Sequence, residues 1–277
     1  MRDTAGQVIV IEPRKGWMSV NFREIWKFRE LLYFLAWRDV KVKYKQTALG
    51  VVWAVLQPVL MMAIFTVLFG RFARMPSDGA PYPIFVFIGL LPWNYFSSVL
   101  GQSTNSLVTG SNLVSKIYFP RLLIPASSAI AAMLDLAIGL AVLGAMMVYY
   151  GVNVSAGTLL VPVLVLITLM NALGFGLWFS AMNVKYRDIR YVIPFLIQIW
   201  MFVTPVIYPK SLFGEKWGWL LLLNPMGGVI EAFRPAVLGN VPIPWTSLLI
   251  SSAIGLAVFV GGVYYFRRVE RYFADII

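Results

Sequence analysis

Long apolar segments alternate with short polar connections along most of the chain. About 20 consecutive apolar residues are needed to cross a bilayer as a helix. Six segments come close to or exceed that length, at 48–70, 84–106, 122–150, 158–182, 191–208 and 245–266. The pattern predicts an all-α integral membrane protein with six transmembrane helices.

The positions of Lys and Arg orient these six segments. If the N-terminal segment is cytoplasmic, 18 of the 23 Lys and Arg residues fall in cytoplasmic connections and five in outer ones. Cytoplasmic loops of membrane proteins carry such an excess. We therefore predict that both termini lie in the cytoplasm, with a cytoplasmic N-terminal segment at 1–47 and a six-span transmembrane domain at 48–277.

Residues 21–45 are expected to form an amphipathic helix ahead of the first span. Two stripes follow the helical period: an apolar one of Trp26, Tyr33, Trp37, Val40 and Tyr44, and a cationic one of Arg23, Lys27, Arg38, Lys41 and Lys45. This arrangement is typical of a helix that lies in the inner headgroup layer, in contact with membrane lipids. The alternative is a soluble helix packed on another cytoplasmic element.

The connection at 211–242 contains two apolar runs that are too short to cross a membrane, at 217–223 and 229–233. Asn224-Pro225, Gly227-Gly228 and Arg234-Pro235 interrupt or follow them. We predict a pair of short re-entrant or interfacial helices on the outer side, between spans five and six. The alternative is an outer loop that rests on the headgroups.

The residue content argues against an enzyme. The chain has no His and no Cys, and its acidic residues are scattered, so we expect no catalytic residue and no metal site. It also lacks the G-x-x-x-x-G-K-[ST] loop that holds nucleotide phosphates. The net charge of +11 lies mostly outside the apolar spans, which favours lipid headgroups over nucleic acid as the partner.

Polar residues inside two spans leave two interpretations open. Asp135 lies in the third span, where it handles substrate or protons or else forms an interhelical hydrogen bond; we favour the second. The second span carries a group of polar residues that either line an aqueous path or bind neighbouring helices: Asn94, Ser97, Ser98, Gln102, Ser103, Thr104, Asn105 and Ser106.

An aromatic stripe follows one face of the fifth span. Its members recur at spacings of four, three and four residues: Tyr191, Phe195, Gln198 and Phe202. Such a face stacks on sugar rings if it meets a channel, or else packs in the core or against lipid.

The short connection after the second span predicts a helix of about two turns, capped by Ser111 or Asn112 and ended by Pro120. It would expose Leu113, Ile117 and Tyr118 beside Lys116. An exposed apolar helix on the cytoplasmic side is suited to docking a soluble partner. The alternative is a plain helix end.

Several stretches, taken in order, resemble type-2 ABC permeases. The first is WRDVKVKYKQTALG at 37–50, followed by VW at 52–53 and LQP at 56–58. The later ones are KIYFPR at 116–121, NVKYRDIR at 183–190 with TPVIYP at 204–209, and LNPM at 223–226 with FR at 233–234. Within these permeases the chain is most similar to exporters of lipid-linked surface polysaccharide, the O-antigen, capsule and teichoic acid group.

The resemblance implies a homodimer with its pore between two copies and two separate ATP-binding subunits, which bind ATP and Mg so that this chain needs no cofactor. It implies a coupling helix at 111–119, with contacts to those subunits from Ser111, Asn112, Leu113, Lys116, Ile117 and Tyr118. The cargo would be an undecaprenyl-diphosphate-linked glycan crossing the bacterial cytoplasmic (inner) membrane.

Two sets of residues are candidates for handling that cargo. The basic residues Arg38, Lys41, Lys43 and Lys45 would attract its diphosphate, or else only anchor the chain at the inner leaflet. The aromatics of the first and fifth spans would line the channel: Trp53, Tyr191, Phe195 and Phe202, with Gln198. The competing functions are a type-2 ABC permease for drugs or other lipids, and a membrane enzyme of polyprenyl-linked glycan synthesis.

Overall fold

The computed structural model describes residues 22–45, 50–116 and 118–273, and within this part every regular element is a helix. In chain order these are α1 (Phe22–Lys27), α2 (Arg29–Lys45), α3 (Gly50–Phe65), the π-helical η1 (Thr66–Phe72), α4 (Tyr82–Thr109), α5 (Ser111–Lys116), α6 (Leu123–Tyr150), η2 (Ala156–Leu160), α7 (Val161–Lys185), α8 (Ile189–Val203), η3 (Lys210–Phe213), α9 (Gly214–Leu223), α10 (Gly227–Leu238) and α11 (Trp245–Glu270).

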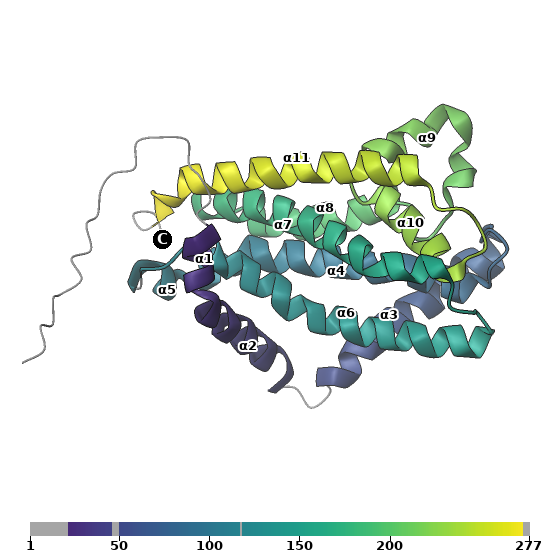
Figure 1. Cartoon of the computed structure of the whole chain (residues 1–277), viewed down its shortest axis with the longest axis horizontal. Coiled ribbons are helices and arrows are strands. Elements are labelled where there is room, and N and C mark those ends of the chain that lie inside the picture. Colours follow the sequence, from purple (N-terminus) through teal and green to yellow (C-terminus); the bar gives the residue numbers. More distant parts are fainter. Residues whose placement is uncertain (1–21, 46–49, 117, 274–277) are drawn as a thin grey trace, which may run out of the picture.

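The long helices run in similar directions and form a bundle (Figure 1). Helix α4 packs against both α6 and α7, and α7 packs against α11. Helices α1, α2 and α5 lie with the end of α11 at one end of the bundle, here called the α5 end. Helices α9 and α10 lie at the other end, here called the α10 end.

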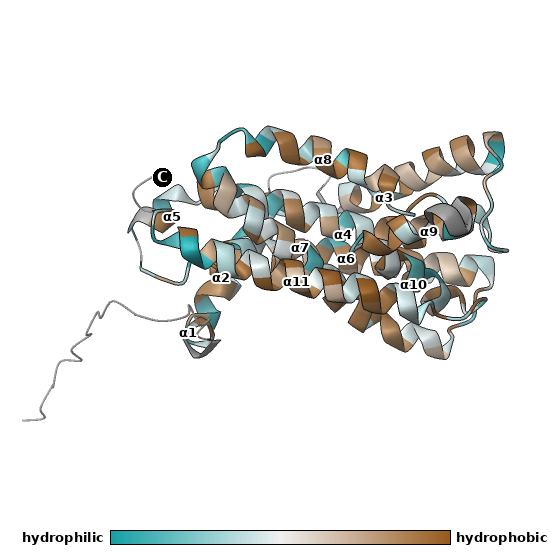
Figure 2. Cartoon of the chain, turned by 90° about the horizontal axis from the view of Figure 1, so that it is seen from above, coloured by the Kyte–Doolittle hydropathy of each residue, from teal (hydrophilic) through white to brown (hydrophobic). Residues whose placement is uncertain are grey.

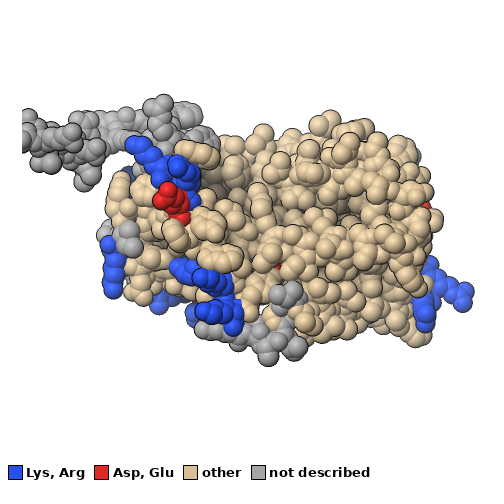
Figure 3. Space-filling view, turned by 60° about the horizontal axis from the view of Figure 1, so that its bottom comes forward, with Lys and Arg blue, Asp and Glu red and all other residues tan. Residues whose placement is uncertain are grey.

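Hydrophobic residues cover the middle of the bundle, and hydrophilic residues gather most densely at the α5 end (Figure 2). On the face shown in Figure 3, Lys and Arg lie toward the two ends, with a belt free of visible Lys and Arg between them. Five helical segments in the described part are long and apolar enough to cross a membrane: Val52–Phe72, Tyr82–Thr109, Leu123–Tyr150, Ala156–Lys185 and Trp245–Glu270. The chain is therefore an integral membrane protein, as predicted.

The fifth predicted span is shorter than expected. Residues 191–208 were predicted as one helix, but α8 ends at Val203 after 15 residues. Thr204 takes an extended conformation (φ −96°, ψ 140°), which the residue before a proline favours, and Pro205 follows. Residues 205–208 then form a buried turn.

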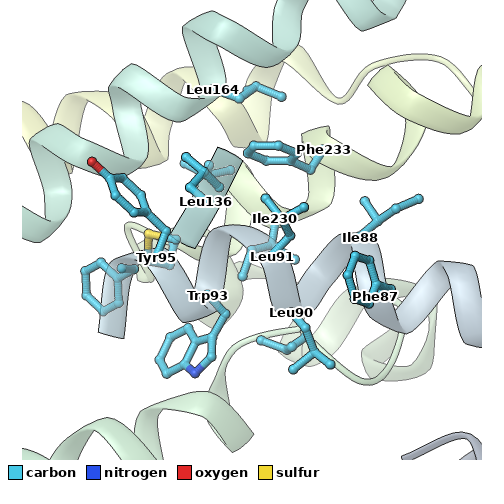
Figure 4. Packing of buried hydrophobic residues seen from close by; sticks show 14 of the residues in the cluster. Phe87, Ile88, Leu90, Leu91, Trp93, Tyr95, Leu136, Leu164, Ile230 and Phe233 are labelled. Atoms are coloured by element: carbon cyan, nitrogen blue, oxygen red, sulfur yellow. The ribbon is translucent and has the colours of Figure 1, made fainter. Parts of the chain in front are cut away.

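Helix α4 forms the centre of the core (Figure 4). Of its most hydrophobic 18-residue window, 78% is buried, against 6% for the span that contains α3. Phe96 of α4 meets Phe175 of α7 and Trp200 of α8 with ring centroids 6.3 and 5.1 Å apart. This edge-to-face arrangement is favoured between aromatic rings, and it joins three helices at one point.

The two short helices predicted between the last two long segments are present, with corrected bounds. Asn224-Pro225 separates α9 from α10, as expected. Gly227-Gly228 begins α10 instead of breaking it, and the helix continues through Pro235 to Leu238. It ends where Gly239 takes a left-handed conformation (φ 64°), which glycine adopts without strain.

Arg234 of α10 supports the turn that follows α8. Its guanidinium donates hydrogen bonds to the carbonyl oxygens of Pro205 (2.7 Å), Val206 (2.8 Å) and Tyr208 (3.3 Å). It also lies 3.8 Å from the centroid of the Phe85 ring. Backbone carbonyls without a helical partner are costly to bury, so this one side chain makes the early end of α8 tolerable.

Helices α7 and α11 approach each other at glycines. A Cβ on Gly174 would lie 2.9 Å from both the Cα and the N of Phe259. On the facing side, a Cβ on Gly262 would lie 2.4 Å from the carbonyl oxygen of Gly174. Small residues let membrane helices pack this closely, because neither backbone is held away by a side chain.

The N-terminal helix is broken once. A single helix was predicted over 21–45, but a turn at Phe28 separates α1 from α2. Trp26, Tyr33 and Trp37 of the apolar stripe are 69%, 63% and 47% exposed. Their exposure is compatible with a helix that lies in the inner headgroup layer, and that placement stays a prediction.

We expect Gly174→Ala to destabilise the protein by about 1–3 kcal/mol, because the added methyl group overpacks the α7–α11 contact. Gly144→Ala is the matched control: a Cβ there meets nothing within 4 Å, so it should be neutral or stabilise by up to about 1 kcal/mol. Thermal unfolding in detergent, followed by circular dichroism, compares the two variants. Equal melting temperatures would contradict the close contact.

Candidate functional site

A polar groove lies between α2, α3, α4 and α6. It consists of two adjoining cavities of about 770 and 760 Å³, and we call their union the α2–α6 groove. The residues that line both cavities are Lys43, Ser97, Ser98, Gly101, Ala132 and Asp135. Pro194 and Ile197 of α8 close one side. Each cavity falls within the roughly 300–1,000 Å³ typical of ligand sites.

The polar residues of α4 fall into two groups: one lines the groove and the other binds neighbouring helices. Asn94, Ser97, Ser98, Gln102, Asn105 and Ser106 line the groove. Ser103 and Thr104 point into the bundle and are fully buried. Ser103 donates to the carbonyl oxygen of Pro125 in α6 (3.1 Å), and the carbonyl oxygen of Thr104 accepts from Asn183 of α7 (3.0 Å). One face of α4 is therefore a polar wall and the other binds helices.

Asp135 of α6 anchors α2 to the groove. Lys43 forms an ion pair with one carboxylate oxygen, and the Tyr44 hydroxyl donates a hydrogen bond to the other. This outcome agrees with the favoured interpretation of Asp135 as an interhelical contact. The partners are a cation and a phenol of the N-terminal helix rather than a neutral side chain of another span.

The proton of Tyr44 stays in place at this contact. Burial, together with the hydrogen bond to Asp135 and its negative charge, raises the pKa of the Tyr44 hydroxyl above its usual value. The hydroxyl is therefore a permanent donor at physiological pH. Asp135 is compensated on both oxygens, which is how a carboxylate is tolerated within an apolar span.

A second contact between α2 and α6 lies near the α5 end. Ser127 of α6 donates to a carboxylate oxygen of Asp39 at 3.2 Å. Arg38 pairs with the other oxygen of Asp39 at 2.8 Å. The α2 helix is thus fixed to α6 at two levels, four to five residues apart on α2 and eight apart on α6. Among the ion pairs of the described residues, the Asp135 contact joins unlike charges between the two helices.

Of the four basic residues predicted to bind the diphosphate, two line the groove and two do not. Arg38 and Lys43 line the groove. Lys41 and Lys45 are exposed on α2 and are not among the residues that line it. Arg38 and Lys43 each have a carboxylate partner, so an incoming anion would have to compete with Asp39 or Asp135 for them.

Of the residues predicted to line the channel, one lies at the groove and the others lie on an exposed face of α8. Trp53 of α3 lines the groove and is 53% exposed. The α8 residues Tyr191, Phe195 and Phe202 are 67%, 66% and 51% exposed, and Gln198 is exposed as well. This α8 face lies on the outside of the single chain rather than in its groove.

The predicted coupling segment contains a short helix, α5, at the α5 end of the bundle (Figure 1). Asn112, Lys116 and Tyr118 are exposed, Tyr118 to 87%. Ser111 is partly buried, and so is Leu113, which packs against a cluster that includes Leu107 and Phe266. Ile117 lies outside the described residues.

Sequence reasoning missed the link from this segment to α11. The backbone N–H of Arg121 donates to the Glu270 carboxylate at 3.0 Å, and the Arg121 guanidinium donates to the carbonyl oxygen of Glu270. Arg267 pairs with the other carboxylate oxygen at 3.0 Å. A glutamate at the polar end of a long apolar helix is the signal from which a tether could have been predicted.

No group of three or more metal-ligating side chains occurs among the described residues. The groove instead offers hydroxyls, amides and paired charges between aromatic rings. This combination suits the binding and passage of a polar molecule.

Asp135→Asn should loosen α2. The variant loses the ion pair with Lys43 and keeps an acceptor for Tyr44; because both charged side chains are partly exposed, we expect a cost of about 1 kcal/mol. Hydrogen–deuterium exchange should become faster in α2 and stay unchanged in α7. The exchanged pair Asp135→Lys with Lys43→Asp should recover part of the protection. Unchanged exchange in α2 would contradict the anchor.

Comparison with known proteins identifies the family. The family described as ABC-2 type transporter matches residues 30–238. An O-antigen export system permease protein, RfbA, of Myxococcus xanthus is 31% identical over 214 residues, which cover 76% of this chain and 82% of that protein. RfbA of Klebsiella pneumoniae is 26% identical over 249 residues (90% and 95%). The polysialic acid transport protein KpsM of Escherichia coli is 25% identical over 237 residues (80% and 89%). These findings confirm the resemblance seen in the sequence motifs: the chain belongs to the ABC-2 type transporter family.

Proposed function

We propose that this chain is the transmembrane permease subunit of an ATP-driven exporter that moves lipid-linked cell-surface polysaccharide across the bacterial cytoplasmic membrane. The observation that carries the proposal is that relatives covering most of the chain are named as O-antigen and polysialic acid transport proteins. The polar α2–α6 groove within an apolar belt supports a polar cargo. A permease for drugs or other lipids remains the alternative.

The proposed topology has six spans, with α8 as the fifth. At 1.5 Å per residue, α8 covers about 22 Å, against a hydrocarbon thickness of roughly 30 Å. Non-helical backbone at membrane depth is tolerated where protein buries it and satisfies its polar groups. The turn after α8 meets both conditions, because it is buried and Arg234 binds three of its carbonyl oxygens. Helices α9 and α10 would then be re-entrant or interfacial on the outer side, and both termini cytoplasmic.

The permease would act as a homodimer. The α3 span is almost unburied in the single chain, and the α8 face of Tyr191, Phe195 and Phe202 is exposed as well. Lipid would cover part of this surface. A second copy that covered the rest would bring the two grooves together and turn their polar walls toward one shared path, in which Trp53 and the α8 aromatics line the channel.

Two ATP-binding subunits would supply the energy, since this chain has no phosphate-binding loop. Asn112, Lys116 and Tyr118 are exposed beside the tether between Arg121 and Glu270, so a push on α5 would reach α11 directly. Helix α2 is fixed to α6 by Asp135, so a movement of α2 would be transmitted to the groove as well.

The cargo would enter with its diphosphate toward α2. Arg38 and Lys43 line the groove, and Lys41 and Lys45 extend the positive surface beyond it. Cations at this level suit the diphosphate of an undecaprenyl carrier. Displacing Lys43 from Asp135 would then couple cargo entry to release of α2.

The test is a gene deletion in the host, complemented by wild type, Lys116→Glu or Lys185→Glu. We expect the deletion to remove surface glycan and to leave undecaprenyl-linked glycan inside the cell. Lys116→Glu should fail to restore export at normal membrane levels, because it reverses the charge of the proposed docking helix. Surface staining and lipid-linked glycan analysis measure both effects.

Lys185→Glu is the matched control, since Lys185 is exposed at the end of α7 outside the proposed coupling elements, and it should restore export. Unchanged surface glycan in a deletion strain without a second exporter would overturn the polysaccharide assignment. Full complementation by Lys116→Glu would overturn only the coupling role of α5 and would leave the export function standing.

A further inference from the structure

A second cavity, separate from the α2–α6 groove, lies at the α10 end. It has a volume of about 720 Å³ and is bounded by the turn at 77–78, η3, α9, α10 and the segment before α11. These elements come from two distant parts of the chain and meet at the end opposite α5 (Figure 1). The cavity has no place in the mechanism described above.

The floor of this cavity is a buried cation. Arg234 and Phe85, two of its buried lining residues, are 6% and 1% exposed. The terminal nitrogens of Arg234 bind carbonyl oxygens of the turn after α8, but its Nε is buried and has no hydrogen-bond partner among the described residues. A buried donor without an acceptor is uncommon in folded proteins, and here it belongs to a residue that lines a cavity.

The walls combine hydrogen-bonding groups with an exposed ring. Lys210 lies 3.3 Å from the Glu231 carboxylate and 2.9 Å from the hydroxyl of Ser247, which fixes both charged groups in place. Asn240 donates to the carbonyl oxygen of Asp78 at 3.0 Å. The indole of Trp219 is 55% exposed at the cavity.

The charges around the cavity balance. Burial lowers the pKa of Arg234 to about 9, so its guanidinium still carries a proton at neutral pH. The described lining residues thus contribute two cations, Lys210 and Arg234, and two carboxylates, Asp78 and Glu231. A balanced set attracts neither a strong anion nor a strong cation. It favours a neutral ligand with many hydroxyls, which use donors and acceptors equally.

Trp219 offers an aromatic surface on which a sugar ring can stack. The C–H face of a pyranose ring is apolar, whereas its rim carries hydroxyls. A partly exposed indole beside a fixed carboxylate and amine offers complementary surfaces to both, and a large aromatic ring is an efficient source of contact area. A phosphate headgroup has no use for the indole and would meet two carboxylates.

We propose that the α10-end cavity binds a neutral saccharide unit of the glycan, stacked on Trp219 and hydrogen-bonded by Glu231 and Lys210. This site rests on the proposed function and deepens it, since it would receive the glycan as it leaves the shared path on the outer side. A glycan held there by successive weak contacts would be hindered from moving back into the path.

The experiment measures binding to the purified full-length chain in lipid nanodiscs, without any transport. The probe is a set of oligosaccharides released by partial hydrolysis from the host's own surface polymer, detected by saturation-transfer NMR. We expect Trp219→Ala to weaken binding about three- to tenfold through loss of stacking, and Trp219→Phe to retain most of it. Trp245→Ala is the matched control, because Trp245 is equally exposed at 55% and does not line the cavity.

Binding that is weakened by Trp219→Ala and not by Trp245→Ala supports the site. Equal binding by wild type and Trp219→Ala, or no binding by wild type, overturns it. Glycerol 1-phosphate serves as a lipid-headgroup probe, and tighter binding of this anion than of the oligosaccharides would also overturn it. Because the readout is binding, a negative result combined with loss of surface glycan in the deletion strain would refute this site alone and leave the export function standing. Thermal unfolding of each variant checks that it is folded.

Discussion

Hydrocarbon offers no hydrogen bonds, so a membrane chain must satisfy its own backbone wherever a helix stops. In the proposed six-span topology, the end of α8 is a point where this constraint applies. Pro205 prevents the helix from continuing, and the following turn is buried. Arg234 arrives from α10 and binds the carbonyl oxygens of Pro205, Val206 and Tyr208. Without a donor of that reach and geometry, neither the short α8 nor the packing of α10 against α4 would be stable.

The same arginine leaves little room beside it. A Cβ on Gly89 of α4 would lie 2.6 Å from the carbonyl oxygen of Val206 and 3.2 Å from Nη2 of Arg234. The first third of α4 is therefore fixed against the turn on one face. The opposite face of α4 carries Ser97 and Ser98 toward α6 and α2, where Asp135 holds Lys43 and Tyr44. The α10 end and the α2–α6 groove are thus connected through one central helix, which links α10 physically to the site where a polar cargo would pass.

Much of this fold was predictable because it depends on local pattern. The length of the apolar segments predicted the long helices. The spacing of Trp26, Tyr33 and Trp37 predicted the exposed face of the N-terminal helix. The early end of α8 could have been foreseen from Thr204-Pro205, since the residue before a proline avoids the helical conformation. Helix α10, by contrast, runs through Pro235 because its neighbours hold it, and no local rule reveals that.

The site itself was only partly predictable. Sequence favoured an interhelical contact for Asp135 but did not reveal its partners, which lie 91 and 92 residues away. Nor did it divide Arg38 and Lys43, which line the groove, from Lys41 and Lys45, which do not. Side-chain direction at a groove depends on how helices cross, and a single sequence carries little information on crossing. For the same reason, it could not tell which face of α4 was the polar wall.

The central claim is that the α2–α6 groove is part of an aqueous path, and thiol accessibility tests it most directly. The chain has no Cys, so single cysteines can be introduced without a background. Ser98 lines both cavities of the groove, whereas Ser103 lies five residues further along the same helix and is fully buried. In membranes, Ser98→Cys should react with a charged, membrane-impermeant thiol reagent and Ser103→Cys should not. Equal protection of both cysteines, with and without ATP and the ATP-binding subunits, would contradict the claim.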